Sequence, residues 1–265
     1  MRADQSPPRW TDAADPRRRV GHTVEWHAEI GSTNDRAREL LAADGDGVAV
    51  VADLQSAGRG RRGRSWLSAP GRNLAVSVGL TMEMAATSAW QLGPSAALAM
   101  HAACATAAEV GLKWPNDLVT LDGERKLGGL LVETAVDGDR LAGAVVGMGI
   151  NVNWTRRELP DELREVTTSL RELSGRSTDR VALLGALLTA LDAEIASLEA
   201  GRSPLERYRS ACVTLGTPVR VETADGPVEG VAREIGARGE LVVESGGRRM
   251  AVTNGDVIRL RPVEA

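Results

Sequence analysis

Apolar residues recur along this chain with two periods, three to four residues in some segments and two in others. The longer period places apolar side chains on one face of a helix, and the shorter period places them on one face of a strand. The pattern predicts helices at 32–44, at 88–110 with an interruption at Gly93 and Pro94, at 181–198 and at 204–212. Ser32 or Thr33 is the expected N-cap of the first helix, and Gly45 is its expected end.

The predicted strands are short, hydrophobic and separated by turn residues. They lie at 47–54, at 73–82 (expected to be half buried), at 118–121, at 127–134 and at 141–148. Hairpins interspersed with helices, in place of a regular βαβ alternation, favour an α+β fold over a doubly wound sheet.

The pattern of the sequence changes near Cys212. From there, four or five short β segments are separated by the turn sequences ADG, ARG, SGG and NG, which predicts a compact barrel-like module of about 50 residues. Residues 1–19 are rich in proline, aspartate and arginine and are predicted to be a disordered tail. The predicted organisation is therefore a tail at 1–19, a large domain at 20–211 that would hold the catalytic site, and a small β domain at 212–265.

Composition narrows the class of protein. The 265 residues carry a net charge of −4, whereas a general nucleic-acid-binding protein usually has a basic balance. Cys104 and Cys212 lie far apart among small apolar residues, so we expect buried thiols in a reducing compartment. The three histidines show no metal-ligand spacing, and no metal site is predicted. Because no segment resembles a signal peptide or a membrane span, we expect a cytoplasmic protein with no membrane partner.

The choice of basic residues is uneven. Of 32 basic residues, 30 are arginine, and the two lysines, Lys113 and Lys126, are thirteen positions apart. An ammonium is a compact point charge and a guanidinium is a planar fork, so the two do not substitute freely in a tight site. The two retained lysines therefore indicate a chemical role for this part of the chain.

Four arginines and three glycines form the segment 58–64, GRGRRGR. Backbone N–H groups of a glycine-rich loop and planar guanidinium donors both suit phosphate or carboxylate groups. The segment is neither a P-loop nor a dinucleotide-binding fingerprint. Taken alone, it also fits an RNA-binding patch or a solvated loop.

Three further segments place polar residues at the ends of predicted strands. They are LKWPNDLV at 112–119, RKLGGLLVE at 125–133 and GMGINVN at 147–153. Pro-Asn-Asp is also common in plain turns, so LKWPNDLV alone does not distinguish a site from a turn. The two glycines that follow Leu127 leave room for a ligand or for another backbone.

Taken in order, GSTN (31–34), QSAGRGRRGRSW (55–66), KWPND (113–117), RKLGGLLVE (125–133) and GMGIN (147–151) resemble the motifs of the biotin–protein ligase family. The resemblance implies an α+β fold, with a mixed-sheet catalytic domain related to class II aminoacyl-tRNA synthetases and then a small SH3-like β-barrel. It implies a ligase that activates biotin with MgATP as biotinyl-5′-AMP. The biotinyl group then passes to a lysine of a biotin carboxyl carrier protein domain of biotin-dependent carboxylases.

The resemblance also implies roles for the residues of these motifs. The residues expected to bind biotin are Ser32, Thr33, Asn34, Gln55, Arg59, Gly60, Arg61 and Lys126. The residues expected to bind the nucleotide are Arg59, Arg61, Arg62, Trp66, Lys113, Asn116 and Asn151, and Mg²⁺ would arrive with ATP. Lys126 and Arg61 are expected to stabilise the reacting carboxylate and phosphate, and Asp117 to orient or deprotonate the incoming lysine.

The sequence leaves two other functions open. A lipoate–protein ligase has a similar fold but a different glycine-rich motif, which this sequence lacks. An RNA-binding module would use the arginine-rich segment, against which the acidic balance and the lack of interleaved aromatic residues argue.

Some biotin–protein ligases carry an N-terminal helix-turn-helix domain that binds DNA. Only 30 residues precede Gly31, too few for three packed helices. We therefore expect a monofunctional ligase without specific DNA binding, present as a monomer or a weak homodimer.

Overall fold

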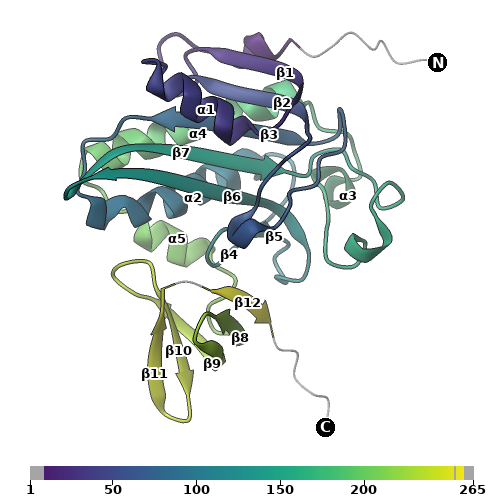
Figure 1. Ribbon diagram of the computed structural model, residues 1–265. Coiled ribbons are helices and arrows are strands. Elements are labelled where there is room, and N and C mark those ends of the chain that lie inside the picture. Colours follow the sequence, from purple (N-terminus) through teal and green to yellow (C-terminus); the bar gives the residue numbers. More distant parts are fainter. Residues whose placement is uncertain (1–8, 254, 260–265) are drawn as a thin grey trace.

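A seven-stranded mixed sheet forms the centre of the larger part of the chain (Figure 1). The computed structural model describes residues 9–253 and 255–259. In spatial order the strands of the sheet are β1 (Val24–Ile30), β2 (Ala49–Gln55), β3 (Leu74–Leu80), β7 (Arg140–Ile150), β6 (Lys126–Asp137), β5 (Asp117–Val119) and β4 (Gly111–Lys113). β1 and β2 are parallel and the other neighbouring strands are antiparallel. The predicted α+β class is confirmed, although β1 and β4 were not foreseen.

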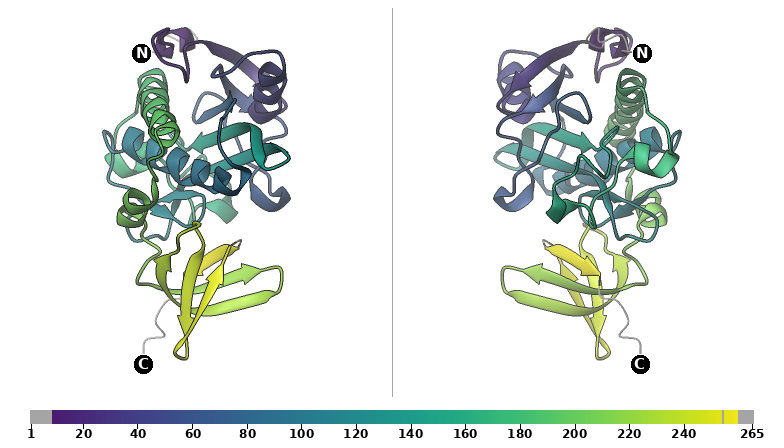
Figure 2. Two further views of the ribbon diagram at one scale, coloured as in Figure 1. Left: turned by 90° about the vertical axis from the view of Figure 1, so that its left-hand side faces the viewer. Right: turned by 90° about the vertical axis from the view of Figure 1, so that its right-hand side faces the viewer.

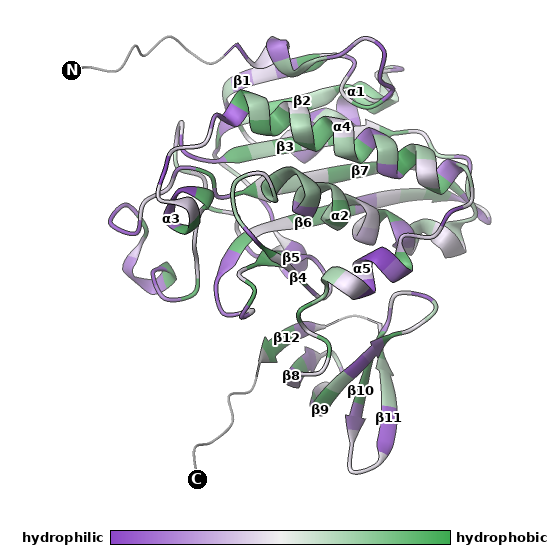
Figure 3. Cartoon of the chain, turned by 180° about the vertical axis from the view of Figure 1, so that it is seen from behind, coloured by the Kyte–Doolittle hydropathy of each residue, from purple (hydrophilic) through white to green (hydrophobic). Residues whose placement is uncertain are grey.

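Helices cover both faces of this sheet. They are α1 (Thr33–Ala42), α2 (Leu92–Cys104), α3 (Leu170–Ser174), α4 (Arg180–Glu199) and α5 (Leu205–Ala211). Short 3-10 turns lie at Trp10–Ala13, Arg61–Gly63, Ala86–Gln91 and Asp161–Leu163. α2 and α4 pack side by side on one face, in front of the strands in Figure 3, and α1 lies on the opposite face.

α4 is the core helix of this unit. By length and composition alone it could also cross a membrane, and it is the one such helix among residues 9–253 and 255–259. Its leucines at 184, 187, 188 and 191 have no exposed surface, and they share one hydrophobic core with α2 and the sheet. The apolar stripe of α4 is therefore explained by packing within the chain.

Large and small residues alternate in the central strands. β3 was predicted to be half buried, and this was wrong, because all of its residues are buried. Its larger side chains face α2 and α4, and its small residues Ser77 and Gly79 lie under α1. A Cβ at Gly79 would lie only 2.8 Å from the carbonyl oxygen of Ala37 in α1. The small residues let the helix approach the sheet closely.

The predicted helix at 88–110 is shorter than expected. It starts as the 3-10 turn Ala86–Gln91, continues without a break as α2, and ends at Cys104. Pro94 lies in the first turn of α2, where the missing N–H is not needed. The predicted interruption at Gly93 and Pro94 was therefore wrong.

The predicted disordered tail needs a correction as well. Residues 1–8 of it lie outside the described residues. From Arg9 onward the prediction was wrong, because Trp10 is only 2% exposed and stacks 4.9 Å from the guanidinium of Arg180. Arg180 also donates a 2.6 Å hydrogen bond to Asp53. One aromatic anchor thus orders a segment of otherwise polar composition.

The second sheet, called the C-terminal sheet below, confirms the predicted module of short β segments. Its strands are β8 (Pro218–Thr223), β9 (Gly226–Ile235), β10 (Leu241–Ser245), β11 (Arg248–Val252) and β12 (Asp256–Arg259), all antiparallel in the order β11-β10-β9-β8-β12. It lies at one end of the larger unit, beside α5 (Figure 2). The domain boundary at residue 212 stays a prediction.

Candidate active site

A cavity of about 650 Å³ lies against the α1 face of the large sheet and reaches the C-terminal sheet. Of the residues predicted to form a site, it is lined by Ser32, Thr33, Asn34, Gln55, Arg59, Gly60, Arg61, Trp66, Lys113, Asn116, Asp117, Lys126 and Asn151. Arg62 does not line it, and its side chain turns toward the C-terminal sheet. Segments spread over 120 positions of the sequence therefore meet in one place.

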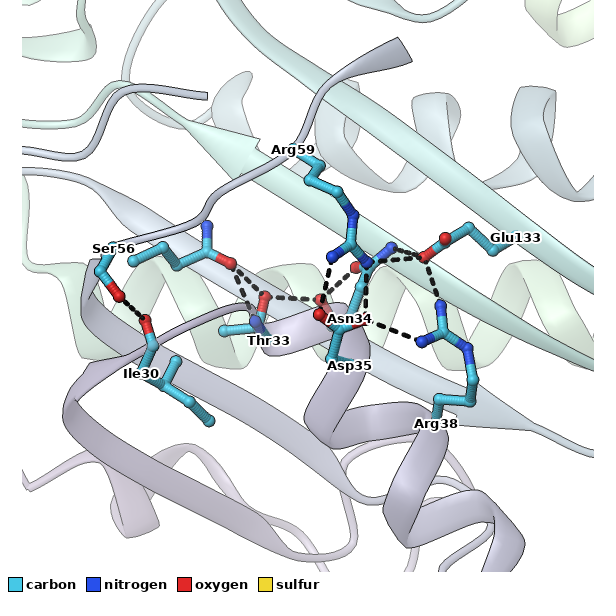
Figure 4. Close-up of polar contacts among 10 residues, drawn as sticks. Ile30, Thr33, Asn34, Asp35, Arg38, Ser56, Arg59 and Glu133 are labelled. Carbon is cyan, nitrogen blue, oxygen red and sulfur yellow. Dashed lines mark hydrogen bonds and ion pairs between the residues drawn. The ribbon is translucent and has the colours of Figure 1, made fainter. Parts of the chain in front are cut away.

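The floor of the cavity is a buried chain of hydrogen bonds at the N-terminus of α1 (Figure 4). The backbone N–H and the hydroxyl of Thr33 donate to Oε1 of Gln55, at 2.9 and 3.0 Å. The hydroxyl oxygens of Thr33 and Ser77 lie 2.7 Å apart, and Ser77 donates to Oδ1 of Asn34 at 2.6 Å. Asn34 in turn donates to Glu133 at 2.6 Å. The chain of hydrogen bonds links side chains of three strands to the first turn of α1.

Two carboxylates and two guanidiniums alternate at the rim of this floor (Figure 4). Arg59 donates two hydrogen bonds to Asp35, at 2.6 and 2.7 Å, and Arg38 donates a third at 2.8 Å. Arg38 also reaches Glu133 at 2.9 Å. The hydrogen bonds from Arg59 lower the pKa of the Asp35 carboxyl to about 2, with a smaller contribution from Arg38 and against partial burial.

Two glycines of β7 make room for these side chains. A Cβ at Gly147 would lie 2.0 Å from Oδ1 of Asn34, and a Cβ at Gly149 would lie 2.6 Å from the ring of Trp66. No side chain larger than hydrogen fits at either position without moving its neighbour. The motif GMGIN therefore has a steric reason, which is access of Asn34 and Trp66 to the face of the sheet.

The segment Gly58–Arg64, called the arginine loop below, bends over the cavity. The backbone N–H of Trp66 donates to Gly58 at 2.9 Å, and that of Gly60 donates to Arg64 at 2.7 Å. These two bonds close the loop at its base. Arg61 lines the cavity and burial lowers the pKa of its guanidinium from the ordinary value. A partly desolvated cation of this kind interacts strongly with an anionic ligand.

The turn of KWPND joins β4 to β5 and carries polar groups into the cavity. Lys113 and Asp117 are paired across this hairpin, and the Trp114–Pro115 peptide bond between them is cis. Nζ of Lys126 lies 2.7 Å from Oδ1 of Asp117 and 5.7 Å from the ring centre of Trp66. Both lysines of the chain thus line the same cavity.

Several residues of the site were missed by the sequence analysis. Ser77 links Thr33 to Asn34, and its signal was a hydroxyl in the middle of a wholly apolar strand. Glu133 accepts the hydrogen bond from Asn34; it is the last residue of the motif RKLGGLLVE, and no role was predicted for it. Asp256 lines the cavity from the C-terminal sheet, and nothing in its local sequence indicated this.

The two cysteines and His101 lie away from the cavity, in structural environments. Both cysteines are buried and unpaired, and burial raises the pKa of Cys104 to about 12. His101 donates to the carbonyl of Val110 at 3.1 Å and has no part in the cavity. Over residues 9–253 and 255–259, no group of three or more His, Cys, Asp and Glu side chains is placed to hold a metal ion.

Comparison with known proteins agrees with this geometry. Residues 28–151 match the model of the biotin/lipoate A/B protein ligase family. The chain is 38% identical over 244 residues to a biotin–[acetyl-CoA-carboxylase] ligase of Mycobacterium tuberculosis, covering 88% of each chain. It is 32% identical over 231 residues to the bifunctional ligase/repressor BirA of Bacillus subtilis, covering 85% of this chain and 70% of that one.

A solved structure supports the same relationship. The biotin protein ligase of Aquifex aeolicus, in complex with biotin and ATP, aligns with a TM-score of 0.74 at 29% identity, covering 90% of this chain and 99% of that one. Fold and cavity thus define a protein of the biotin/lipoate ligase class. Because its relatives over most of the chain are biotin ligases, this chain belongs to the biotin–protein ligase family.

The first prediction concerns the carboxyl of Asp35. Its pKa of about 2 lies below the ordinary value of 3.8, so the stabilisation from its ion pairs is complete above about pH 4 and is lost as the pH falls toward 2. Arg59→Gln removes the largest cause of the shift, and we expect the pKa of Asp35 to rise. NMR titration of the side-chain carboxyl measures it. Arg72→Gln, which removes a partner of Glu158 instead, is the control. An unchanged pKa in Arg59→Gln contradicts the prediction.

Proposed function

We propose that the cavity binds biotin and MgATP, forms biotinyl-5′-AMP with release of pyrophosphate, and passes the biotinyl group to a lysine of a carrier domain. One observation carries the proposal. The arginine loop, both lysines of the chain and a buried hydrogen-bond network line a single cavity of about 650 Å³. The Aquifex aeolicus ligase, similar over 90% of this chain, was solved with biotin and ATP.

The floor of the cavity suits the head group of biotin. Thr33 and Ser77 each carry one hydroxyl hydrogen, yet their oxygens make three close contacts, to Gln55, to each other and to Asn34. One of these contacts therefore lacks a hydrogen, so a hydroxyl oxygen keeps a lone pair that can accept an N–H from a ligand. The cyclic urea of biotin offers two N–H donors and one carbonyl acceptor, which match such a network.

Positive charge at the other side of the cavity suits the reacting groups. In the first step, an oxygen of the biotin carboxylate bonds to the α-phosphorus of ATP, and the bond to pyrophosphate breaks. Arg61 and Lys126 hold the carboxylate and the α-phosphate together and offset the charge that builds up there. Lys113, Asn116 and Asn151 hold the nucleotide, and Mg²⁺ arrives bound to the phosphates of ATP.

The second step needs a neutral amine. Asp117, 2.7 Å from Lys126, takes the proton of the incoming lysine when Lys126 engages the ligand instead. The amine nitrogen then bonds to the carbonyl carbon of the biotinyl group, the bond from that carbon to the phosphate oxygen breaks, and the second N–H proton passes to the phosphate of the departing AMP. Lys126 therefore acts in the first step, and its partner Asp117 acts in the second.

Trp66 forms a wall between the two ends of the cavity. Its ring packs on Gly149, and its indole N–H is buried without an acceptor among the described residues. A donor buried in this way is costly unless a partner arrives. We assign it to a ligand oxygen on the nucleotide side.

The buried thiols and the ion pairs of the arginine loop bear on the compartment and the partners of the enzyme. Two buried free thiols suit a reducing compartment, and we propose the cytoplasm. The loop arginines are bound by Asp35 and Asp256, which does not favour an RNA-binding role for them. A monomer or weak homodimer, with no specific DNA partner, stays our expectation.

The test of the proposal is covalent labelling. We expect a biotin carboxyl carrier domain, incubated with this protein, biotin and MgATP, to gain the mass of one biotinyl group on one lysine. Replacing biotin by lipoate should give no product. Equal labelling with lipoate, or no labelling with any carrier domain of a biotin-dependent carboxylase, would refute the proposal.

The role of Lys126 predicts a large effect of Lys126→Arg, although the charge is kept. A planar guanidinium cannot take the place of a compact ammonium between Asp117 and Trp66 without displacing the ligand. Loss of one such contact costs about 3 kcal/mol, or about a hundredfold in rate. Pyrophosphate release with biotin and MgATP measures it, and the melting temperature reports the fold. A folded variant within about threefold of the wild-type rate would exclude this role.

The wall formed by Trp66 predicts a strong effect of Gly149→Ala. The added methyl would meet the Trp66 ring at 2.6 Å and displace it. We expect the rate of pyrophosphate release to fall by about tenfold or more. Gly143→Ala is the matched control on the same strand, because its methyl meets the end of the Leu41 side chain at 3.2 Å and the carbonyl oxygen of Leu80 at an ordinary contact distance of 3.5 Å. Similar rates in both variants would argue against the wall.

A further inference from the structure

The arginine loop is bound at its far side by the C-terminal sheet. The two oxygens of Asp256 are shared between two loop residues, with Arg64 at 2.5 Å and Arg62 at 3.3 Å. Arg62 also donates to the carbonyl of Glu222 at 3.1 Å, and Arg61 donates to the carbonyl of Gly255 at 3.3 Å. Three arginines of the loop thus contact β8, the start of β12 or the glycine that precedes β12.

The position of Asp256 is fixed by its own strand. It is the first residue of β12 and pairs with Glu222 of β8. The preceding Gly255 lies so close to β8 that a Cβ there would meet Val221 at 2.5 Å. Strand pairing and this close packing therefore fix where the backbone of Asp256 lies, which is what a group that positions others requires.

The loop needs carboxylates at both ends, because its four guanidiniums repel one another. Asp35 of α1 holds Arg59 at the near end, and Asp256 holds Arg62 and Arg64 at the far end. Arg62 has a left-handed backbone with φ of 56°, which sends its side chain away from the cavity. Arg61, between these holding points, lines the cavity.

We propose that Asp256 is a positioning residue for the ligase reaction: by binding Arg62 and Arg64 it holds the arginine loop over the cavity, with Arg61 toward the reacting phosphate. This rests on the proposed function for the reaction itself. The C-terminal sheet is then part of the active site, because it sets the loop without touching the biotin end of the cavity.

The expected effects are moderate, because these ion pairs are partly exposed. An exposed pair shifts an equilibrium by roughly 1.5-fold to fivefold, so two pairs acting together shift it by roughly twofold to twenty-fivefold. In Asp256→Asn we expect amide hydrogen exchange at Gly60 and Trp66, in the protein without ligands, to speed up by about that factor. We expect the KM for MgATP to rise by a similar factor, while the Kd for biotin alone changes by less than about twofold.

Two variants separate charge from structure. Asp256→Glu keeps a carboxylate that can reach both arginines, and should restore both readouts to within about threefold of wild type. Glu229→Gln removes an exposed carboxylate of β9 that pairs with Arg220 and not with the loop, and should leave both readouts unchanged. If Asp256→Asn and Glu229→Gln behave alike, the proposal is wrong.

A third variant guards against a general loss of structure in β12. In a background of Arg62→Gln and Arg64→Gln, Asp256→Asn should cause no further change in exchange or in the KM for MgATP. An undiminished further change would overturn the proposal. The exchange measurements need neither biotin nor ATP, so they decide the role of Asp256 even if the chain proves not to be a biotin ligase.

Discussion

The cavity depends on two glycines of β7 at the centre of the large sheet. At Gly147 and Gly149 the strand presents no side chain to the face that α1 covers. Asn34 and Trp66 occupy the space that two Cβ atoms would otherwise fill. On the other face of the same strand, Val146 and Met148 belong to the core under α2 and α4. One strand thus serves two purposes, since alternate positions point to opposite faces. The helices hold the sheet from behind while its front is left open for a ligand.

Electrostatics imposes the second constraint on the site. Four guanidiniums within seven residues cannot lie close together unless anions are brought to them. The chain supplies Asp35 from its first helix and Asp256 from its last described strand. Arg61 lies between these two carboxylates in the sequence; it donates to the carbonyl of Gly255 at 3.3 Å and lines the cavity.

Local sequence signals predicted most of the residues that line this cavity, and long-range contacts supplied the rest. GSTN, GRGRRGR, KWPND and GMGIN each carry their meaning in a few adjacent residues, so their place in one cavity could be anticipated. The anchoring of Trp10 depends on Arg180, and the placement of Asp256 depends on pairing between β8 and β12. No pattern of neighbouring residues encodes such contacts. The complete burial of β3 was missed for the same reason, because α1 covers its small residues only in the folded chain.

The near-exclusive use of arginine has a consequence for the chemistry of the whole surface. An acyl adenylate that escapes from its cavity acylates whatever neutral amine it meets first. The only lysine side chains of this chain line that cavity, and its 30 other basic residues are arginines, which stay protonated and are poor nucleophiles. The arginine side chains on the surface of this protein therefore react poorly with such a reagent. Stray acylation therefore finds no lysine side chain on this chain outside the cavity, and the charge of the arginines is preserved over many turnovers.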